Sequence, residues 1–445
     1  MSLKASISGI RGIIGKTLTP QLIIDSLSAF SKILPKGKVL LGRDSRTSGE
    51  AIANLVKGTL NLLGRDVVDI GIVTTPVVLF GVNEDNFAGG IIITASHNNE
   101  EWNALKLVNS NGKFISPKEF ENFLLESYTK EYCYVSYKEI GNSSFDNNIV
   151  NNHRKKILDF IDKDIIKSKK FKVAVDTING GGCTIAKTFL DELNCQTIAI
   201  NGDPTGIFNH PPEPTPKNLS NLSNLVKKEK VDIGFALDPD GDRLVISDEN
   251  GNILSEELTL ALSVKHYLTN YEKSDVVINL STSSVIEHIT KEVGVKLFRA
   301  KTGEINVTEE MELINSTIGG EGNGGVIAYK LNKCRDAMVG IAFILEMVAK
   351  SGKNIGQLVS ELPEYFLIKE KFTITNIDFN KIEEKIKTQF KNENINTLDG
   401  LRIDFNESWV LIRKSNTEPI IRVFAEAMNE EKAKEIIENI KNLIF

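Results

Sequence analysis

The chain has 445 residues, of which 41% are hydrophobic and 25% are charged. This balance is that of a globular protein with buried cores, and it excludes a mainly disordered or fibrous chain. At about 150 residues per domain, the length predicts roughly three domains. The formal net charge of -6 gives no electrostatic reason to expect a nucleic acid or an anionic membrane as partner. A small anionic substrate needs only a local basic pocket and is compatible with this charge.

Cysteine and histidine are sparse, with 4 and 5 residues respectively. The cysteines are far apart and form no C-x-x-C pair, so we expect neither a disulfide framework nor a zinc site. The sequence shows no basic leader followed by an apolar segment, and no apolar run long enough to span a bilayer. We therefore expect a cytoplasmic protein with no membrane partner.

Short apolar runs that end in polar or glycine-rich loops recur along the chain, with helix-like stretches between them. Runs of this kind are typical of strands buried on both faces of a sheet. Their alternation with helices predicts an α/β fold with parallel or mixed sheets. In such sheets, ligands gather in the loops beyond the carboxyl ends of the strands. The runs lie at 38–41, 90–93, 173–175, 233–237 and 276–280.

Changes in composition predict where the domains divide. An asparagine-rich stretch at 142–152, a turn at 248–252 and the segment Leu362-Pro363-Glu364 each suit a boundary. Beyond the third boundary, the pattern predicts paired strands and a final helix with one apolar face. A similar rhythm in the preceding α/β units suggests internal repetition. We expect domains at 1–148, 149–250, 251–362 and 363–445.

The first candidate site is the segment 237–243, in which Asp238, Asp240 and Asp242 alternate with turn-forming residues after a buried strand. Three carboxylates at this spacing can converge on one cation, and hard oxygen ligands in a small site favour Mg²⁺. Arg243 would suit a phosphate oxygen. An acidic surface turn is the simpler alternative, but such a turn does not need the apolar strand that precedes it.

The same segment also resembles the nucleophile loop of haloacid-dehalogenase-type phosphatases. In that case Asp238 would become phosphorylated and Asp240 would act as acid or base. That loop continues with threonine or valine after the glycine, whereas this chain continues with Asp242. The third aspartate favours metal ligation over an aspartyl nucleophile.

Ser96 lies in a loop of small residues, 94–98, at the end of a predicted strand. A serine in this place can approach a metal or a phosphate. We expect no catalytic dyad between Ser96 and His97, because neighbouring side chains rarely face each other. The Gly-x-Ser-x-Gly motif of many hydrolases is missing.

Two further loops carry candidate ligand-binding groups. The glycine-rich loop 319–325 can bring the carboxylate of Glu321 and the amide of Asn323 close to sugar hydroxyls. The segment 413–419, followed by Arg422, offers guanidinium, hydroxyl and backbone donors that suit a phosphate dianion. It contains no Walker A sequence, so nucleotide binding is not indicated.

Taken together and in this order, the motifs resemble those of the α-D-phosphohexomutase family. The resemblance covers nearly the whole chain. It includes an N-terminal arginine segment, a phosphoserine loop, a lysine segment, a metal loop, a sugar loop and a phosphate loop. These correspond to Gly9–Gly12, Thr94–Asn98, Trp102–Lys106, Asp238–Asp242, Gly320–Gly325 and Arg413–Arg422.

The resemblance implies four domains around a central cleft, three similar α/β units with mixed sheets and a smaller α+β C-terminal domain. It also implies that phosphorylated Ser96 gives its phosphoryl group to a hexose phosphate. The resulting bisphosphate reorients and returns its other phosphate to Ser96, which moves the phosphate between C1 and C6. One Mg²⁺ per chain and a hexose 1,6-bisphosphate activator are implied as well.

The resemblance assigns roles to particular residues. Ser96, Lys106, Arg11 and His97 would be catalytic. Ser96, Asp238, Asp240 and Asp242 would bind the metal. Arg243, Glu321, Asn323, Arg413, Ser415, Asn416, Thr417 and Arg422 would bind the substrate.

Some positions depart from the family pattern. Asn99 and Ala104 replace a common proline and glycine. In the sugar loop, Asn323 and Gly325 occupy the places of a serine and a histidine, so an imidazole contact is lost. This loop and the segment 303–307 look most like those of prokaryotic phosphoglucosamine mutases. We therefore predict conversion of glucosamine 6-phosphate to glucosamine 1-phosphate, with phosphomannomutase/phosphoglucomutase activity as the alternative.

Two hypotheses from other classes stay open at this point. One is a phosphatase with Asp238 as nucleophile, and the other is a sugar-phosphate-binding protein without catalysis. The presence of Ser96, Lys106 and the three aspartates argues against both. The expected partner is a small sugar phosphate, and the expected state is a monomer or homodimer.

Overall fold

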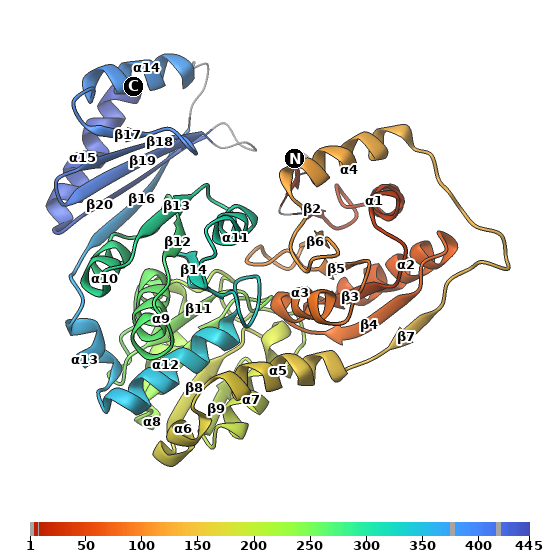
Figure 1. The fold of residues 1–445 in the computed structure, drawn as a ribbon, viewed down its shortest axis with the longest axis horizontal. Coiled ribbons are helices and arrows are strands. Elements are labelled where there is room, and N and C mark those ends of the chain that lie inside the picture. Colours follow the sequence, from red (N-terminus) through yellow and green to blue (C-terminus); the bar gives the residue numbers. More distant parts are fainter. Residues whose placement is uncertain (1–3, 8, 374–378, 415–419) are drawn as a thin grey trace.

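The computed structural model describes residues 4–7, 9–373, 379–414 and 420–445. Four sheets, each with its own helices, follow one another along the chain. Figure 1 shows the four units in an arc, with the red-to-orange N-terminal unit at one end and the blue C-terminal unit at the other. This is the predicted arrangement of three α/β units and a smaller final one. Among the described residues, no helix combines the length and apolar character needed to cross a membrane.

The first unit is built on a mixed sheet of seven strands in the order β1-β2-β6-β5-β3-β4-β7. Because side chains alternate along a strand, Val39 and Leu41 of β3 pack with α1 and α2, whereas Leu40 packs with α3 on the other face. Both faces of the sheet are therefore covered. The elements are β1 (Lys4–Ser6), β2 (Gly9–Ile13), α1 (Pro20–Ile33), β3 (Val39–Arg43), α2 (Gly49–Leu62), β4 (Val67–Ile72), α3 (Thr75–Glu84), β5 (Gly89–Ile93), β6 (Trp102–Val108), α4 (Pro117–Thr129) and β7 (Ser143–Phe145).

The second unit has a four-stranded sheet in the order β11-β10-β8-β9. All five residues of β10 are buried, as expected for a strand covered on both faces. The elements are α5 (Asn148–Phe160), α6 (Lys163–Lys169), β8 (Lys172–Asp176), η1 (Gly181–Thr184), α7 (Ala186–Glu192), β9 (Gln196–Ile200), η2 (Pro216–Asn218), α8 (Ser220–Glu229), β10 (Ile233–Leu237) and β11 (Leu244–Ser247).

The third unit has a four-stranded sheet in the order β13-β12-β14-β15. Its helix α12 is buried from its first residue to Ala349, because it lies between neighbouring units and not at the surface. The elements are α9 (Glu256–Asn270), β12 (Val276–Asn279), α10 (Val285–Val293), β13 (Leu297–Ala300), α11 (Glu304–Leu313), β14 (Ile318–Glu321), β15 (Gly325–Ala328), α12 (Ala337–Ser351) and α13 (Ile355–Ser360).

The first three units repeat one pattern of four strands, β6-β5-β3-β4, β11-β10-β8-β9 and β15-β14-β12-β13. In each, the first two strands form an antiparallel hairpin and the remaining pairings are parallel. The suggested internal repetition is therefore confirmed. The three hairpin loops are equivalent positions in the repeat, and they carry Ser96, the aspartate cluster and the residues that follow Glu321.

The fourth unit is an antiparallel sheet in the order β16-β20-β19-β18-β17. It has its own core, in which Val410 and Val423 pack with Ile437 and Ile440. The first three units instead share one continuous core that extends from Leu40 to Leu362. The elements are β16 (Phe366–Thr373), α14 (Phe379–Gln389), β17 (Asn394–Asn396), β18 (Leu401–Phe405), β19 (Ser408–Lys414), β20 (Ile420–Ala427) and α15 (Glu430–Ile444).

Candidate active site

Ser96 lies in the hairpin loop between β5 and β6, where it meets the second unit. Its Oγ donates a hydrogen bond to Oδ2 of Asp238 over 3.1 Å, and the residue is only 4% exposed. The backbone of Ser96 has φ 49°, in the left-handed region, which is unfavourable for a residue other than glycine. A hydrogen bond of 3.0 Å from its N–H to Oγ1 of Thr94 supports this conformation.

Arg46 also fixes the Ser96 loop, and the sequence did not reveal this role. Its guanidinium donates to the carbonyl oxygens of Ser96 and Asn98, at 2.6 Å each, and to that of Asn99 at 2.6 Å. Its Nε is 3.0 Å from Oδ2 of Asp44. Arg46 is 1% exposed, so these contacts form a buried and charge-assisted support for the loop. The sequence indicated only that Arg46 lies in the loop after an apolar run, 38–41, which forms β3 beside β5.

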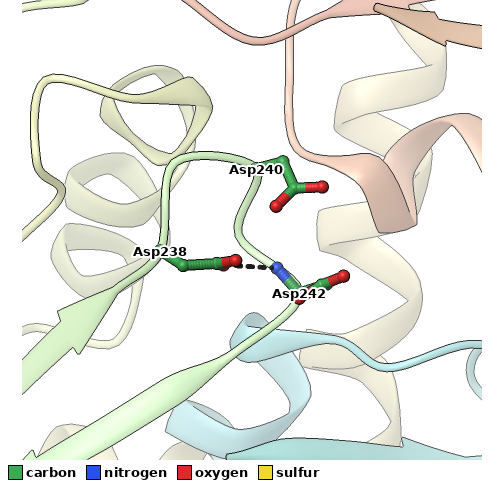
Figure 2. Close-up of side chains that lie close together, drawn as sticks. All are labelled: Asp238, Asp240 and Asp242. Atoms are coloured by element: carbon green, nitrogen blue, oxygen red, sulfur yellow. Dashed lines mark hydrogen bonds between the residues drawn. The ribbon is translucent and has the colours of Figure 1, made fainter. Parts of the chain in front are cut away.

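The three predicted metal ligands come together in the hairpin loop between β10 and β11, as Figure 2 shows. Their carboxylates offer oxygen atoms that all lie within 4.8 Å of one another. The N–H of Asp242 donates to Oδ1 of Asp238 over 3.1 Å, and this bond closes the loop. Gly241 has φ 65°, and a Cβ there would lie 2.4 Å from Thr74. The turn thus requires glycine at this position.

The aspartate cluster fits a divalent cation. Asp238, Asp240 and Asp242 are all 0% exposed, and the Oδ1 atoms of Asp240 and Asp242 are buried without a hydrogen-bond partner. Burial and the two neighbouring carboxylates raise the pKa of Asp238 well above its usual range. Buried carboxylates that repel one another need positive charge nearby. Hard oxygen donors in a small site suit Mg²⁺.

Lys106 supplies part of that charge from β6. Its Nζ is 2.6 Å from Oδ2 of Asp240 and 3.8 Å from Oδ2 of Asp242. Burial lowers the pKa of Lys106, but the two aspartates outweigh it and leave that pKa above its usual value. Burial likewise raises the pKa of Asp240, but Lys106 and the Thr75 hydroxyl, 2.7 Å away, together hold it below its usual range. The ammonium and this carboxylate are therefore both charged.

Arg11 and His97 border the Ser96 loop. Arg11 is on β2, beside β6, and its Nη1 donates to Oδ1 of Asn98 over 2.6 Å. The Nδ1 atom of His97 is 3.3 Å from Ser96 Oγ. The two neighbouring side chains thus lie together, although neighbours rarely face each other, and the backbone of Ser96 between them is left-handed. That they form no catalytic dyad stays a prediction. Burial, Arg243 and Arg11 lower the pKa of His97 well below its usual value, so its imidazole is neutral.

Glu321, at the end of β14, is connected to the aspartate cluster through Arg335 and is already hydrogen-bonded within the chain. Its Oε1 accepts from Asn279 Nδ2 over 2.7 Å and from the Gly303 N–H over 2.9 Å. Its Oε2 accepts from Arg335 over 3.0 Å. The neighbouring Asn323 has a buried Oδ1 atom without a partner. Asn323 therefore offers a free acceptor, while Glu321 retains only its remaining lone pairs for a ligand.

Arg335 links the two loops and was also missed in the sequence. Its Nη2 is 2.6 Å from Oδ2 of Asp242, its Nη1 is 3.0 Å from Oε2 of Glu321, and its Nε is 2.8 Å from Oε2 of Glu304. The three acidic residues precede it by 93, 14 and 31 positions. No local spacing could therefore have revealed the contact.

The remaining predicted substrate residues are in two places. Arg243 follows the aspartate cluster, with Nε 3.7 Å from Oδ1 of Asp242 and without a hydrogen-bond partner. Arg413 and Arg422 are opposite each other in the register of β19 and β20, in the fourth unit, whereas Ser96 belongs to the first. Arg413 is paired with Asp399 over 3.0 Å. The predicted residues Ser415, Asn416 and Thr417 lie outside the described residues.

Comparison with known families agrees with this architecture. The four domain models of the phosphoglucomutase/phosphomannomutase family match in order: α/β/α domain I at 3–134, domain II at 151–251, domain III at 256–366 and the C-terminal domain at 373–443. The chain belongs to this family. It is therefore a phosphohexomutase, an isomerase that works by phosphoryl transfer, and the predicted resemblance is confirmed.

Individual relatives give the same result. The chain is 37% identical to a phosphoglucomutase/phosphomannomutase of Thermococcus kodakarensis, over 97% of this chain and 96% of that protein. It is 33% identical to a protein of Pyrococcus horikoshii named probable phosphoglucosamine mutase, over 98% and 96%. A crystal structure of a phosphoglucomutase/phosphomannomutase family protein from Burkholderia thailandensis has a TM-score of 0.86 at 24% identity, over 99% and 97%. That last likeness shows the fold alone.

Proposed function

We propose that the protein interconverts hexose 6-phosphate and hexose 1-phosphate through phosphorylated Ser96, with glucosamine phosphate as its substrate. The observation that carries this proposal is the hydrogen bond of 3.1 Å between Ser96 Oγ and Asp238 Oδ2. This bond places the hydroxyl group of a buried serine directly against a buried group of three carboxylates. Phosphoryl transfer depends on such positioning and on neutralisation of negative charge.

In the proposed reaction, a hydroxyl oxygen of the bound sugar forms a bond to the phosphorus on Ser96. The bond between phosphorus and Ser96 Oγ breaks at the same time, and Oγ keeps the electron pair. The sugar hydroxyl loses one proton and the serine oxygen gains one, so the step is balanced. Lys106 and Arg11 are cations here and stabilise the negative charge. We assign the movement of the proton to the same pair: one of them gives a proton to Ser96 Oγ as it leaves and then accepts the proton of the sugar hydroxyl, with the neutral His97 beside the serine oxygen. The reverse step returns the other phosphate after the bisphosphate has reoriented.

Asp238, Asp240 and Asp242, with an oxygen of the phosphoserine, would hold one Mg²⁺. When bound, such an ion supplies charge neutralisation for the transferred phosphoryl group. The unpartnered Oδ1 atoms of Asp240 and Asp242 support this assignment. A hexose 1,6-bisphosphate would serve as activator, because it can phosphorylate Ser96 when the phosphate has been lost.

The proposed substrate contacts come from the sugar loop and the fourth unit. Asn323 offers a free acceptor for a hydroxyl or ammonium hydrogen, and Glu321 lies beside it. Arg243, Arg413 and Arg422 would hold phosphate oxygens. To these we add Ser415, Asn416 and Thr417, from the sequence alone.

Glucosamine phosphate and the neutral hexose phosphates are separate candidates. The relatives from Pyrococcus horikoshii and Methanopyrus kandleri, at 33% and 32% identity, are named probable phosphoglucosamine mutases. The Thermococcus kodakarensis relative at 37% identity is named phosphoglucomutase/phosphomannomutase, which supports glucose or mannose phosphate as the second candidate. The sugar loop without a histidine favours the first.

The phosphatase hypothesis has less support. Oδ1 of Asp238 accepts hydrogen bonds from the N–H groups of Asp242 and Arg243, and Oδ2 accepts one from Ser96. Both oxygens of Asp238 thus already accept hydrogen bonds, and the acceptor capacity that remains suits a metal ion. The contact with Ser96 is used by the mutase reaction and has no role in the phosphatase reaction.

We retain as proposals the domain boundaries near 148, 250 and 362, a monomer or homodimer, and a cytoplasmic location.

The test compares kcat/KM for glucosamine, glucose and mannose phosphates, with Mg²⁺ and the matching bisphosphate. A large preference for glucosamine phosphate supports the proposal, and a preference for glucose or mannose phosphate selects the alternative. Ser96→Ala should abolish isomerisation and remove the phosphate that mass spectrometry detects. The control is Ser168→Ala, at an exposed serine. Turnover by Ser96→Ala would refute the phosphoserine pathway.

A further inference from the structure

The backbone at Arg335 is held rigidly between β15 and α12. The next residue, Asp336, begins α12 by accepting a hydrogen bond of 3.0 Å from the N–H of Met338. Its other oxygen lies 2.6 Å from His153 Nε2 and 3.1 Å from Asn332 Nδ2. Arg335 itself is 8% exposed. The backbone from which the Arg335 side chain extends is therefore held by buried contacts with residues of two units.

The guanidinium of Arg335 contacts one carboxylate from each of three segments. Asp242 belongs to the metal loop, Asp238–Asp242, and Glu321 belongs to the sugar loop, Gly320–Gly325. Glu304 is the first residue of α11. The three contacts use three different nitrogens of a planar group, at 2.6, 3.0 and 2.8 Å. A lysine ammonium is a single point of charge and cannot reproduce this arrangement.

Gly325 provides the space through which the Arg335 side chain passes. A Cβ on Gly325 would lie 2.1 Å from Cδ and 2.8 Å from Cγ of Arg335. Any larger side chain at position 325 would displace the arginine stem, because these distances are far below van der Waals contact. The space in which the family pattern has a histidine is thus already occupied in this chain.

We propose that Arg335 is a positioning residue, which holds the metal loop and the sugar loop at a fixed separation, and that Gly325 makes this possible. The inference rests on the proposed mutase reaction. The bisphosphate binds in two orientations, one for each half-reaction. In both orientations, the distance between the metal loop and the residues that contact the sugar must be the same. A guanidinium bonded to Asp242 and Glu321 together keeps that separation constant.

A purely structural role and a purely electrostatic role make different predictions. If Arg335 only stabilised the fold, loss of activity would follow loss of folded protein. If it only supplied charge, Arg335→Lys would retain full activity. A positioning role requires that Arg335→Lys remain folded and bind metal, yet lose affinity for the sugar phosphate and turnover.

The first experiment uses Arg335→Lys in the full-length protein. We expect kcat/KM to fall at least about tenfold, since a misplacement near 1 Å can cost about 100-fold. The affinity for glucosamine 6-phosphate, measured by calorimetry, should fall as well. Mn²⁺ binding, measured by electron paramagnetic resonance, and the melting temperature should stay close to those of the wild type. The matched control is Arg154→Lys on α5, which alters an ion pair with Glu192 of α7.

The second experiment tests whether Gly325 acts through Arg335. We expect Gly325→Ala alone to reduce kcat/KM, because its Cβ displaces the arginine. In the Arg335→Ala background, which lacks the Cγ and Cδ atoms that the new Cβ would meet, the same alanine should cause little additional loss, since residues in contact are non-additive. The control is Gly58→Ala in α2, where a Cβ meets nothing within 4 Å.

Each outcome decides the inference. Additive losses in the double variant, full activity in Arg335→Lys, or parallel loss of Mn²⁺ binding and folding would each overturn it. A wild-type protein that binds the sugar phosphate without isomerising it would refute the proposed function alone. In that case the binding measurements on Arg335→Lys still test the positioning role.

Discussion

Ser96 Oγ lies 3.1 Å from Oδ2 of Asp238, although 142 positions separate the two residues. They occupy equivalent hairpin loops of the first and second units, between β5 and β6 and between β10 and β11. The contact exists because these units share one hydrophobic core, which fixes their relative placement. The reacting group and the proposed metal ligands are therefore preorganised before substrate binds.

The first prediction concerns Asp240→Asn. The change removes one negative charge from the cluster but keeps the shape of the side chain. We expect the affinity for Mn²⁺ to fall by at least about tenfold, since even outer-sphere partners of a metal are worth 10–100-fold. Titration calorimetry with Mn²⁺ measures this directly. An exposed carboxylate, Glu364, provides the control variant Glu364→Gln, and unchanged affinity in Asp240→Asn would contradict the metal assignment.

The second prediction concerns Lys106→Met, which keeps the aliphatic length and removes the ammonium. Asp240 then loses a buried partner at 2.6 Å, and breaking a buried ion pair typically costs about 3–5 kcal/mol. We expect a lower melting temperature in scanning calorimetry together with loss of turnover. In the double variant Lys106→Met/Asp240→Asn, the melting temperature should recover in part while activity stays absent. Recovery of both would argue that Lys106 serves stability alone.

The third prediction concerns Arg46→Lys. A lysine cannot bond the carbonyl oxygens of Ser96, Asn98 and Asn99 together, as the guanidinium does. We expect the Ser96 loop to lose its fixed conformation and kcat to fall by about 100-fold, as for a reacting group misplaced by 1 Å. Mn²⁺ binding should persist, because Arg46 does not contact the aspartate cluster through any of these bonds. Steady-state kinetics and Mn²⁺ titration on one preparation separate the two effects.

The fourth prediction concerns pH and Glu257, which is 6% exposed. Burial raises its pKa to about 8, although Lys369 and the Ser283 N–H oppose this shift. Between pH 4.5 and about 8, the folded protein therefore keeps a proton on Glu257 that the unfolded chain has lost. The resulting stabilisation is complete below pH 4.5 and is lost as the pH rises through 8.

Glu257→Gln should consequently show a smaller fall in melting temperature than the wild type between pH 5 and pH 9. The glutamine can still accept from the Ser283 N–H through its carbonyl oxygen. Scanning fluorimetry across this range provides the measurement, with Glu364→Gln as the exposed control. Parallel curves for Glu257→Gln and the wild type would show that Glu257 does not titrate in this window.

The sequence was sufficient to predict the α/β units, their repetition and the loops that carry Ser96 and the aspartates. These features follow from local patterns, because an apolar strand followed by a polar turn can be recognised in a single stretch. The close approach of Ser96 to Asp238 then followed from the family resemblance. The roles of the individual side chains are predictions that the variants above address.

Arg46 and Arg335 could not be predicted in the same way. The partners of Arg335 are 14, 31 and 93 positions away, so its role depends on how three segments pack. Burial of an arginine also runs against its usual preference for the surface. Three carboxylates compensate for the burial of Arg335, and loop carbonyl oxygens with one aspartate do so for Arg46. The contact between Ser96 and His97 was missed for a different reason. In extended chain, neighbours point to opposite faces, and here a left-handed residue reverses that rule.

The separate core of the fourth unit has a mechanical consequence. The groups proposed to make and break bonds are anchored in one continuous body formed by the first three units, whereas Arg413 and Arg422 stand on a sheet packed around its own interior. The two bodies meet at a small buried seam, where Leu280 packs with Trp409 and Leu411. A displacement of the fourth unit therefore disturbs this seam, while the core that aligns Ser96 with Asp238 is left intact.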